Sequence, residues 1–212
     1  MSKLGTDFYQ REDVLAISRQ LLGKVLCTNF NGSHTAGIIV ETEAYAGVAD
    51  RASHAYGSSR TNRTEVMYSP PGTAYVYLCY GIHHLFNVVT NVEGVPHAVL
   101  IRAIEPMEGI DIMLQRRKMD TLKTSLTAGP GILSQALGIS TQHSGISLLG
   151  DNIWIEDNHP LYLSKRSDGW YNKPKNFDII SSPRVGCQYA GKDAHNPWRF
   201  RIKENKWVSP AK

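Results

Sequence analysis

The chain has 212 residues, of which 42% are hydrophobic and 20% are charged, with 18 Gly and 10 Pro. This length suits one domain with its own core, and the composition excludes a low-complexity chain. No apolar run approaches the ~20 residues of a membrane span, and the first ten residues lack the apolar core of a secretion signal. Three cysteines without CxxC spacing disfavour a disulfide framework and favour a reducing compartment. We therefore expect one domain over residues 1–212, located in the cytoplasm and not in a membrane.

The net charge is modest, +4, but the basic residues are unevenly distributed. Residues 163–212 contain eleven Lys or Arg against four Asp or Glu, a local balance of +7. Such an excess suits a phosphate-rich partner, although a solvated basic tail has the same composition. Charge alone leaves both interpretations open.

In the first half of the chain, an amphipathic helix is expected over residues 12–22, ended by Gly23. Strands over 24–30 and 36–45 flank Asn31-Gly32, a strong hairpin turn signal. Residues 47–65 have little periodicity, and an irregular segment of that length is typical of a functional loop. Strands over 73–80 and 83–90 form a second hairpin around Gly81-Ile82.

In the second half, a strand is expected within residues 95–105 and a helix from Pro106 to about Asp120. A short helix follows Gly131, and further strands are expected at 152–156, 161–164 and 199–203. Many strands joined by hairpins, with few helices, predict an α+β fold with a mostly antiparallel sheet.

The segment VETEAY, residues 40–45, carries the first candidate chemistry. Side chains alternate along a strand, so Glu41, Glu43 and Tyr45 share one face. They either face solvent at a sheet edge, or one glutamate is a general base beside an aromatic wall. Spacing alone does not choose between Glu41 and Glu43.

Tyr75, Tyr77 and Tyr80 make the second hairpin aromatic. Strand tyrosines usually pack and hydrogen-bond. Tyr80, next to the turn, has little core to reach and could instead insert between stacked bases. Arg102 lies inside the apolar strand AVLIRAI, where an unpaired charge is costly. It is either the partner of a core glutamate or a positioning group beside a catalytic one.

The histidines 54, 83, 84 and 97 do not match a known metal-ligand spacing. His83 and His84 are adjacent in a strand and point to opposite faces, so they cannot easily share one ion. No nucleophile elbow and no phosphate-binding loop is present in the sequence. We therefore expect no catalytic metal.

Ordered blocks along most of the chain resemble the alkyladenine (3-methyladenine) DNA glycosylase family. They are VETEAY (40–45) with His54, TNR (61–63), PGTAYVYLCYGIHHLFN (71–87), VLIRAIEP (99–106), GPGILSQALGI (129–139), PRVGCQYAG (183–191), PWRFRI (197–202) and WVS (207–209). The chain lacks the long N-terminal extension of animal members, which indicates a bacterial member.

The resemblance implies a single α+β domain with a curved antiparallel sheet, flanking helices and a protruding β-hairpin that enters the DNA minor groove. It implies a monofunctional enzyme of base excision repair that binds duplex DNA as a monomer and needs no cofactor. The substrates would be alkylated or deaminated purines of the 3-methyladenine, 7-methylguanine, hypoxanthine and ethenoadenine class. Hydrolysis of the N-glycosidic bond by water would leave an abasic site.

The resemblance also assigns residues. Glu43 would activate water beside Arg102, and Tyr80 would fill the gap left by the flipped nucleotide. The extruded base would lie among Tyr45, His54, Tyr77 and Asn87, with Asn87 disfavouring the exocyclic amine of guanine. Basic residues of 51–64 and of the C-terminal third would hold phosphates.

Two other classes compete with this interpretation. One is a non-catalytic binder of damaged or distorted DNA, against which the presence of both Glu43 and Arg102 argues. The other is a formyl-transferring domain, whose C-terminal fold is similar but which would lack the glutamate–tyrosine pocket.

Overall fold

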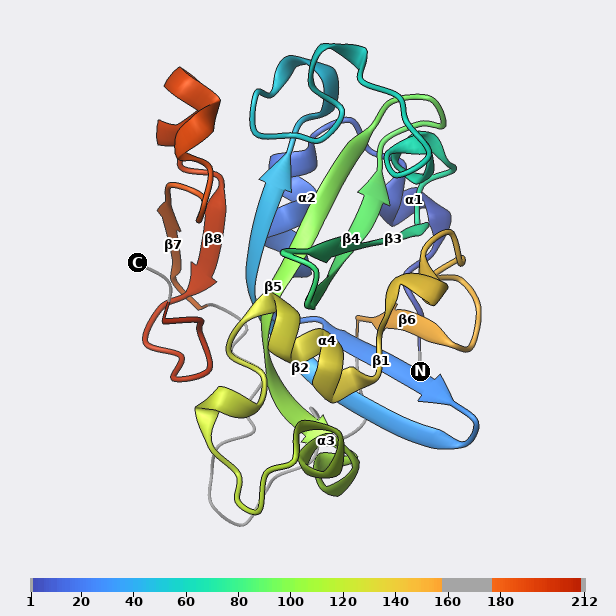
Figure 1. Ribbon diagram of the computed structural model, residues 1–212, viewed down its shortest axis with the longest axis vertical. Coiled ribbons are helices and arrows are strands. Elements are labelled where there is room, and N and C mark those ends of the chain that lie inside the picture. The colour runs from blue at the N-terminus through green and yellow to red at the C-terminus, as the bar shows by residue number, and fades with distance from the viewer. Residues whose placement is uncertain (1, 158–176, 211–212) are drawn as a thin grey trace.

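The computed structural model describes residues 2–157 and 177–210, and within them eight strands form one antiparallel sheet (Figure 1). The strands are β1 (Val25–Phe30), β2 (Ser33–Tyr45), β3 (Ala74–Cys79), β4 (His83–Thr90), β5 (His97–Glu108), β6 (Ile153–Glu156), β7 (Ile179–Ser182) and β8 (Arg199–Ile202). Their order is β3-β4-β5-β2-β1-β6, with β8 also pairing β2 and β7 pairing β8. The predicted α+β class with a mostly antiparallel sheet is confirmed.

β2 is the long central strand, and it makes the sheet curl. Its first half pairs β1 from Val25↔Ile38 onward, whereas its second half pairs β8 at Glu41↔Arg201 to Glu43↔Arg199. On its other side β2 pairs β5 along most of its length. The strand that carries the two glutamates is therefore covered on both edges by backbone partners.

The pairing of β2 with β5 is irregular at the glutamates. Ile39 pairs Ile104, Glu41 pairs Ala103 and Thr42 pairs Ile101, so Val40 on one strand and Arg102 on the other lack a direct partner. Such bulges bend a strand and re-aim side chains, and they are common beside functional sites. Here they lie next to both Glu41 and Arg102.

Four α-helices accompany the sheet in the described part of the chain: α1 (Thr6–Tyr9), α2 (Val14–Leu21), α3 (Ile110–Arg117) and α4 (Pro130–Leu137). Asp13 caps α2 by accepting a hydrogen bond from the Ala16 N–H at 2.9 Å. α2 buries Val14, Ile17 and Leu21 and lies behind β2 in Figure 1, whereas α4 lies in front of the strands. The main core fills the space between these helices and the sheet.

Both hairpin predictions are confirmed, and the backbone explains them. Asn31 and Gly32 have φ of 54° and 80°, and Tyr80 and Gly81 have φ of 52° and 72°. Two successive positive φ values give the turn whose twist matches that of the flanking strands. Residues 47–65, expected to be a loop, connect β2 to β3 and contain only short 3-10 turns.

The prediction of a helix starting at Pro106 was wrong. β5 continues to Glu108, with Pro106 paired to Gly37 of β2, and α3 begins at Ile110 after Gly109, whose φ is 64°. Pairing with β2 extends the strand past a residue that often begins a helix. The helix α1 and the strand β7 were not predicted, and the strand predicted at 161–164 lies outside the described residues.

Candidate active site

A cavity of about 420 Å³ opens where the β3–β4 hairpin, the 47–65 segment and residues 185–189 meet the ends of β2 and β5. The seven residues to which the resemblance assigns roles all line it, although they come from five separate stretches of chain. These seven are Glu43, Tyr45, His54, Tyr77, Tyr80, Asn87 and Arg102.

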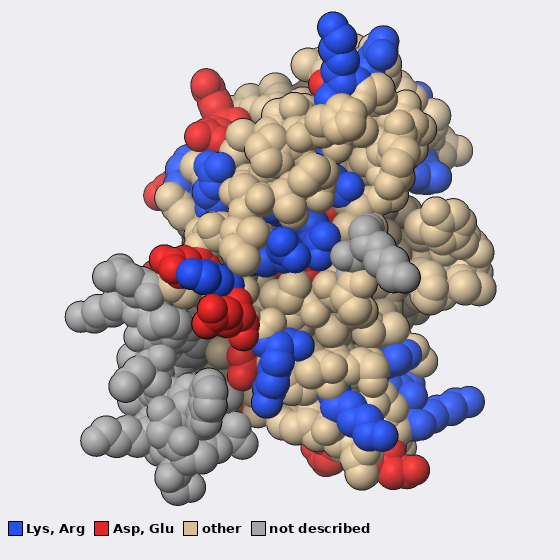
Figure 2. Space-filling model, turned by 90° about the vertical axis from the view of Figure 1, so that its left-hand side faces the viewer, with Lys and Arg blue, Asp and Glu red and all other residues tan. Residues whose placement is uncertain are grey.

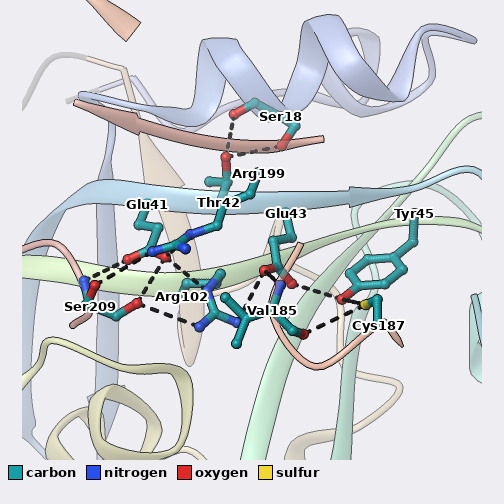
Figure 3. Close-up of polar contacts among 10 residues, drawn as sticks. All are labelled: Ser18, Glu41, Thr42, Glu43, Tyr45, Arg102, Val185, Cys187, Arg199 and Ser209. Atoms are coloured by element: carbon teal, nitrogen blue, oxygen red, sulfur yellow. Dashed lines mark hydrogen bonds and ion pairs between the residues drawn. The ribbon is translucent and has the colours of Figure 1, made fainter. Parts of the chain in front are cut away.

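Glu43 has no solvent exposure but its carboxylate faces this cavity. One oxygen accepts the Val185 N–H at 2.8 Å and lies 3.3 Å from an Arg102 terminal nitrogen (Figure 3). The other oxygen accepts the Tyr45 hydroxyl at 2.8 Å. These contacts fix the plane of the carboxylate at the cavity wall.

Glu41 is equally buried but does not line the cavity. Its carboxylate accepts the Nε–H groups of Arg102 at 2.9 Å and Arg199 at 2.7 Å, and both the N–H and the hydroxyl of Ser209, at 2.6 and 2.9 Å. The interpretation of these glutamates as a solvent-facing edge is wrong, because strand pairing and the arginines enclose both. The structure also separates them: only Glu43 is placed to meet a molecule in the cavity.

Arg102, which the sequence left as either a core partner or a positioning group, contacts both carboxylates. Its side chain is 6% exposed. Electrostatic interaction with Glu43 and Glu41 outweighs burial and raises the pKa of the guanidinium. Arg102 therefore places a fixed positive charge in the wall of the cavity.

Tyr45 lies beside Glu43 and donates to it. Burial, followed by the negative charge of Glu43, raises the pKa of the phenol well above its ordinary value, so the hydroxyl keeps its proton. The Arg184 guanidinium lies 4.8 Å from the centre of the Tyr45 ring and makes a bidentate pair with Asp50. This buried pair joins the start of the 47–65 segment to the 183–191 segment behind the tyrosine.

His54 and Tyr77 form an aromatic wall, with ring centres 4.6 Å apart in edge-to-face contact. The Arg63 guanidinium, which can only donate, lies 2.6 Å from Nε2 and 3.1 Å from Nδ1 of His54, and Nδ1 also lies 2.9 Å from the Tyr75 hydroxyl. Burial first and Arg63 second lower the pKa of His54 to about 4. The imidazole is therefore neutral at physiological pH.

Asn87 is buried on β4, and its amide nitrogen donates to the carbonyls of Tyr75 at 3.1 Å and Leu85 at 3.2 Å. Both amide hydrogens are used within the hairpin, which fixes the side chain at the cavity wall.

Tyr80, at the tip of the β3–β4 hairpin, is 89% exposed, and its neighbours Leu78 and Ile82 are also exposed. A tyrosine with φ of 52° adopts a backbone conformation that L-residues with large side chains rarely use. An exposed aromatic ring held at a strained turn does not contribute to the core.

Four further residues line the cavity. Tyr75 was noted from the sequence only as a hairpin tyrosine and Arg63 only as a basic residue for phosphates, whereas Val185 and Cys187 were not singled out. Val185 acts through its backbone N–H, which no residue type reveals. Cys187 lies 3.9 Å from the Tyr45 hydroxyl. Val185 and Cys187 belong to the PRVGCQYAG block, which marked the segment but not its contacts.

Comparison with known proteins gives the family. The sequence model of methylpurine-DNA glycosylase matches residues 7–206. The chain belongs to the methylpurine-DNA glycosylase family.

Curated relatives agree over nearly their whole length. A protein of Clostridium perfringens (strain SM101 / Type A), named as a predicted 3-methyladenine DNA glycosylase, is 43% identical over 215 residues, covering 98% of each chain. Proteins with the same name from Bacillus cytotoxicus and Chlamydia felis are 43% and 44% identical, covering 95% and 97% of this chain and 97% and 100% of theirs.

The family match sets the class of activity. A methylpurine-DNA glycosylase is a DNA glycosylase, a DNA repair enzyme that acts in base excision repair on a DNA substrate. The formyl-transferring alternative is set aside by this match. No helix within residues 2–157 and 177–210 has the length and apolar character needed to cross a lipid bilayer.

Proposed function

We propose that this protein releases alkylated or deaminated purines from duplex DNA by hydrolysing the N-glycosidic bond with a water molecule activated by Glu43. The names of the relatives support 3-methyladenine as a substrate. The 7-methylguanine, hypoxanthine and ethenoadenine substrates belong to the same proposal. The observation that carries it is the placement of Glu43 in the cavity beside Arg102, while Glu41 is fully engaged elsewhere.

The reaction needs a flipped nucleotide, because the glycosidic bond of a stacked base cannot reach a buried carboxylate. Water would lose a proton to Glu43 while its oxygen bonds to the sugar C1′ and the bond from C1′ to the base nitrogen breaks. A cationic alkylated purine leaves as a neutral molecule, so no group has to protonate it. A neutral purine such as hypoxanthine leaves as an anion, which would take its proton from water. For the cationic substrates, a cavity in which His54 is neutral and the Tyr45 hydroxyl keeps its proton is sufficient.

The aromatic side chains suit the proposed substrate. The faces of Tyr45 and Tyr77 attract a positively charged purine by cation–π interaction, and stacking on them replaces part of what the base loses in the duplex. Asn87, fixed by its bonds to the hairpin backbone, would meet the purine near its 2-position and exclude guanine. Tyr80 would insert where the nucleotide has left. We further propose that the protein acts as a monomer.

The experiment is release of free base from duplex DNA treated with a methylating agent, with enzyme in excess. We expect 3-methyladenine in the supernatant and alkali-labile abasic sites in the DNA, with no strand break before alkali. A second set of duplexes, each with one 7-methylguanine, hypoxanthine or ethenoadenine, ranks the other substrates. Binding to these duplexes without base release would favour the alternative, a non-catalytic binder of damaged DNA.

A further inference from the structure

Behind the cavity, a second group of polar side chains surrounds Glu41 and is closed by Ser209 (Figure 3). Glu41, Arg102 and Arg199 come from β2, β5 and β8, and Ser209 comes from the segment after β8. Every one of these side chains is less than 8% exposed. Of these four only Arg102 lines the cavity, so the other three have no direct access to a bound base.

Arg102 is shared between this group and the cavity. Its Nε donates to Glu41 at 2.9 Å and a terminal nitrogen contacts the Ser209 hydroxyl at 3.5 Å, while the other terminal nitrogen lies 3.3 Å from Glu43. A guanidinium is planar and rigid, so fixing two of its nitrogens fixes the third. The position of the nitrogen next to Glu43 is therefore set by Glu41 and Ser209.

Ser209 contacts every other member of the group. Its backbone N–H and its hydroxyl both donate to Glu41, and its carbonyl lies 3.5 Å from a terminal nitrogen of Arg199. Trp207, 5% exposed, packs into the main core two residues earlier and anchors the segment. The C-terminal segment thus reaches the catalytic strand 168 residues away in sequence.

The buried charges balance only when Glu43 is counted with the group. Two guanidinium groups, of Arg102 and Arg199, then face two carboxylates, of Glu41 and Glu43. A buried ion that loses its partner is strongly destabilising, so loss of Glu41 would free Arg102 to turn toward Glu43 or away from it.

We infer that Glu41 and Ser209 are positioning residues for the proposed hydrolysis, which hold the Arg102 guanidinium in place against Glu43 and the attacking water. This rests on the proposed function, since Arg102 matters only if the cavity is catalytic. Neither residue touches the DNA or the base. Their effect is on the rate of bond cleavage and not on the affinity for damaged DNA.

The test compares Ser209→Ala with Ser18→Ala. Ser18 is also a buried serine, on α2, and its hydroxyl donates to Thr42 at 3.0 Å on the opposite face of β2 (Figure 3). Both changes remove one buried hydroxyl near the same strand, but only Ser209 contacts Arg102. The measurements are the single-turnover release of 3-methyladenine from alkylated duplex DNA, the Kd for the same DNA in the cold, and the melting temperature.

We expect Ser209→Ala to lower the single-turnover rate at least fivefold, with Kd within twofold of the wild type. Ser18→Ala should keep the wild-type rate within twofold at a similar loss of melting temperature. Equal rates for the two variants, or a Ser209→Ala loss confined to Kd, would overturn the inference. A wild-type protein that releases no base would instead refute the proposed function.

Glu41→Gln is the stronger change, but its amide hydrogens would face arginine and serine donors, and the variant can fail to fold. If it folds, we expect a larger rate loss than that of Ser209→Ala, again without weaker binding. A folded Glu41→Gln variant with the wild-type rate would contradict the inference. Ser209→Ala decides the matter if Glu41→Gln is insoluble.

Discussion

The Tyr45 hydroxyl donates to Glu43 at 2.8 Å while the ring lines the cavity, so under the proposed function one side chain would both orient Glu43 and stack on the extruded purine. Tyr45→Phe separates the two, because phenylalanine keeps the ring and loses the donor. A hydrogen bond to a charged group contributes about 1.5–3 kcal/mol, so we expect excision about tenfold slower or more. Single-turnover release of 3-methyladenine measures the rate, and Kd for the same DNA should be unchanged. An unaltered rate would show that the hydroxyl does not orient Glu43.

The lowered pKa of His54 makes the stability of the folded protein depend on pH. Its pKa is lowered to about 4, against about 6.5 in an unfolded chain, so between these values the unfolded state binds a proton that the folded state does not. This contribution to stability is complete above about pH 6.5 and is lost as the pH falls toward 4. Urea unfolding at pH 7 and pH 5 should therefore show a smaller pH dependence for His54→Gln than for the wild type.

Other histidines also contribute to the pH dependence of stability in the His54→Gln comparison. The pKa values of His97 and His143 are also lowered by burial, so some loss of stability toward pH 5 persists in the variant. Identical pH dependence in the variant and the wild type would mean that the pKa of His54 is the same in the folded and unfolded states.

At the residue scale, the sequence predicted the candidate site residues better than it predicted the residues that contact them. Glu43, Arg102 and Tyr45 were predicted from strand parity and from the resemblance, and the structure brings them together. Strand parity left Glu41 and Glu43 open, and only the resemblance pointed to Glu43. The contacts that distinguish the two come from Ser209 and Arg199 at the far end of the chain. No local pattern predicts such long-range partners.

At the scale of elements, the position of Tyr80 at the tip of the β3–β4 hairpin allows a structural role and a functional role to be distinguished by experiment. The ring is 89% exposed, so Tyr80→Ser should change the free energy of unfolding by no more than about 0.5 kcal/mol. If the ring replaces a flipped nucleotide, its loss lowers the flipped population, most for lesions that still pair well. We expect a larger loss of hypoxanthine excision from a paired duplex than from a mismatched one.

The two readouts for Tyr80→Ser are melting temperature and single-turnover excision on both duplexes. A fall of many degrees in melting temperature would assign the ring to packing. Equal losses on the paired and mismatched duplexes would mean that the ring does not assist flipping.

Hairpins were the elements that the sequence predicted best, because Asn-Gly and the Gly81 turn are local signals. The end of β5 was predicted worst. Pro106 continues a strand there because β2 offers a long pairing edge, with the helix delayed to Ile110. Bulges at Val40 and Arg102 were also invisible in the sequence, since they depend on the register between two strands.

At the scale of the whole molecule, basic residues are spread over the face that carries β7 and β8. Figure 2, which views the side that carries β7 and β8, shows Lys and Arg side chains in separate groups with acidic side chains near some of them. Of the eleven basic residues after position 162, those at 165, 166, 173, 175 and 212 lie outside the described residues, and Arg184 and Arg199 are buried in ion pairs. Arg184 and Arg199 are therefore not available to phosphates.

Phosphate binding should still make DNA affinity depend on salt. Each phosphate that the protein neutralises releases counterions, so log Kd should rise about linearly with log salt for intact and damaged duplexes alike. Arg51 is exposed beside cavity-lining residues, whereas Arg60 is already paired with Glu65 at 2.7 Å. We expect Arg51→Gln to reduce the salt slope by about one.

Lys123→Gln is the matched control for Arg51→Gln, because Lys123 is exposed in the segment between α3 and α4, away from the 47–65 segment (Figure 1). Its salt slope should equal that of the wild type. Affinity that stays flat between about 50 and 200 mM salt would rule out phosphate binding as the main contribution.

Activation of water by Glu43 is tested most directly by single-turnover release of 3-methyladenine from alkylated duplex DNA by the Glu43→Gln variant. Glutamine keeps the shape of the side chain but cannot take a proton, so the loss belongs to bond cleavage. We predict no release above the uncatalysed background, with Kd for the same DNA within a few-fold of the wild type. Release at a rate near that of the wild type would contradict the role of Glu43, and parallel loss of binding would mean that the change disrupts the cavity instead.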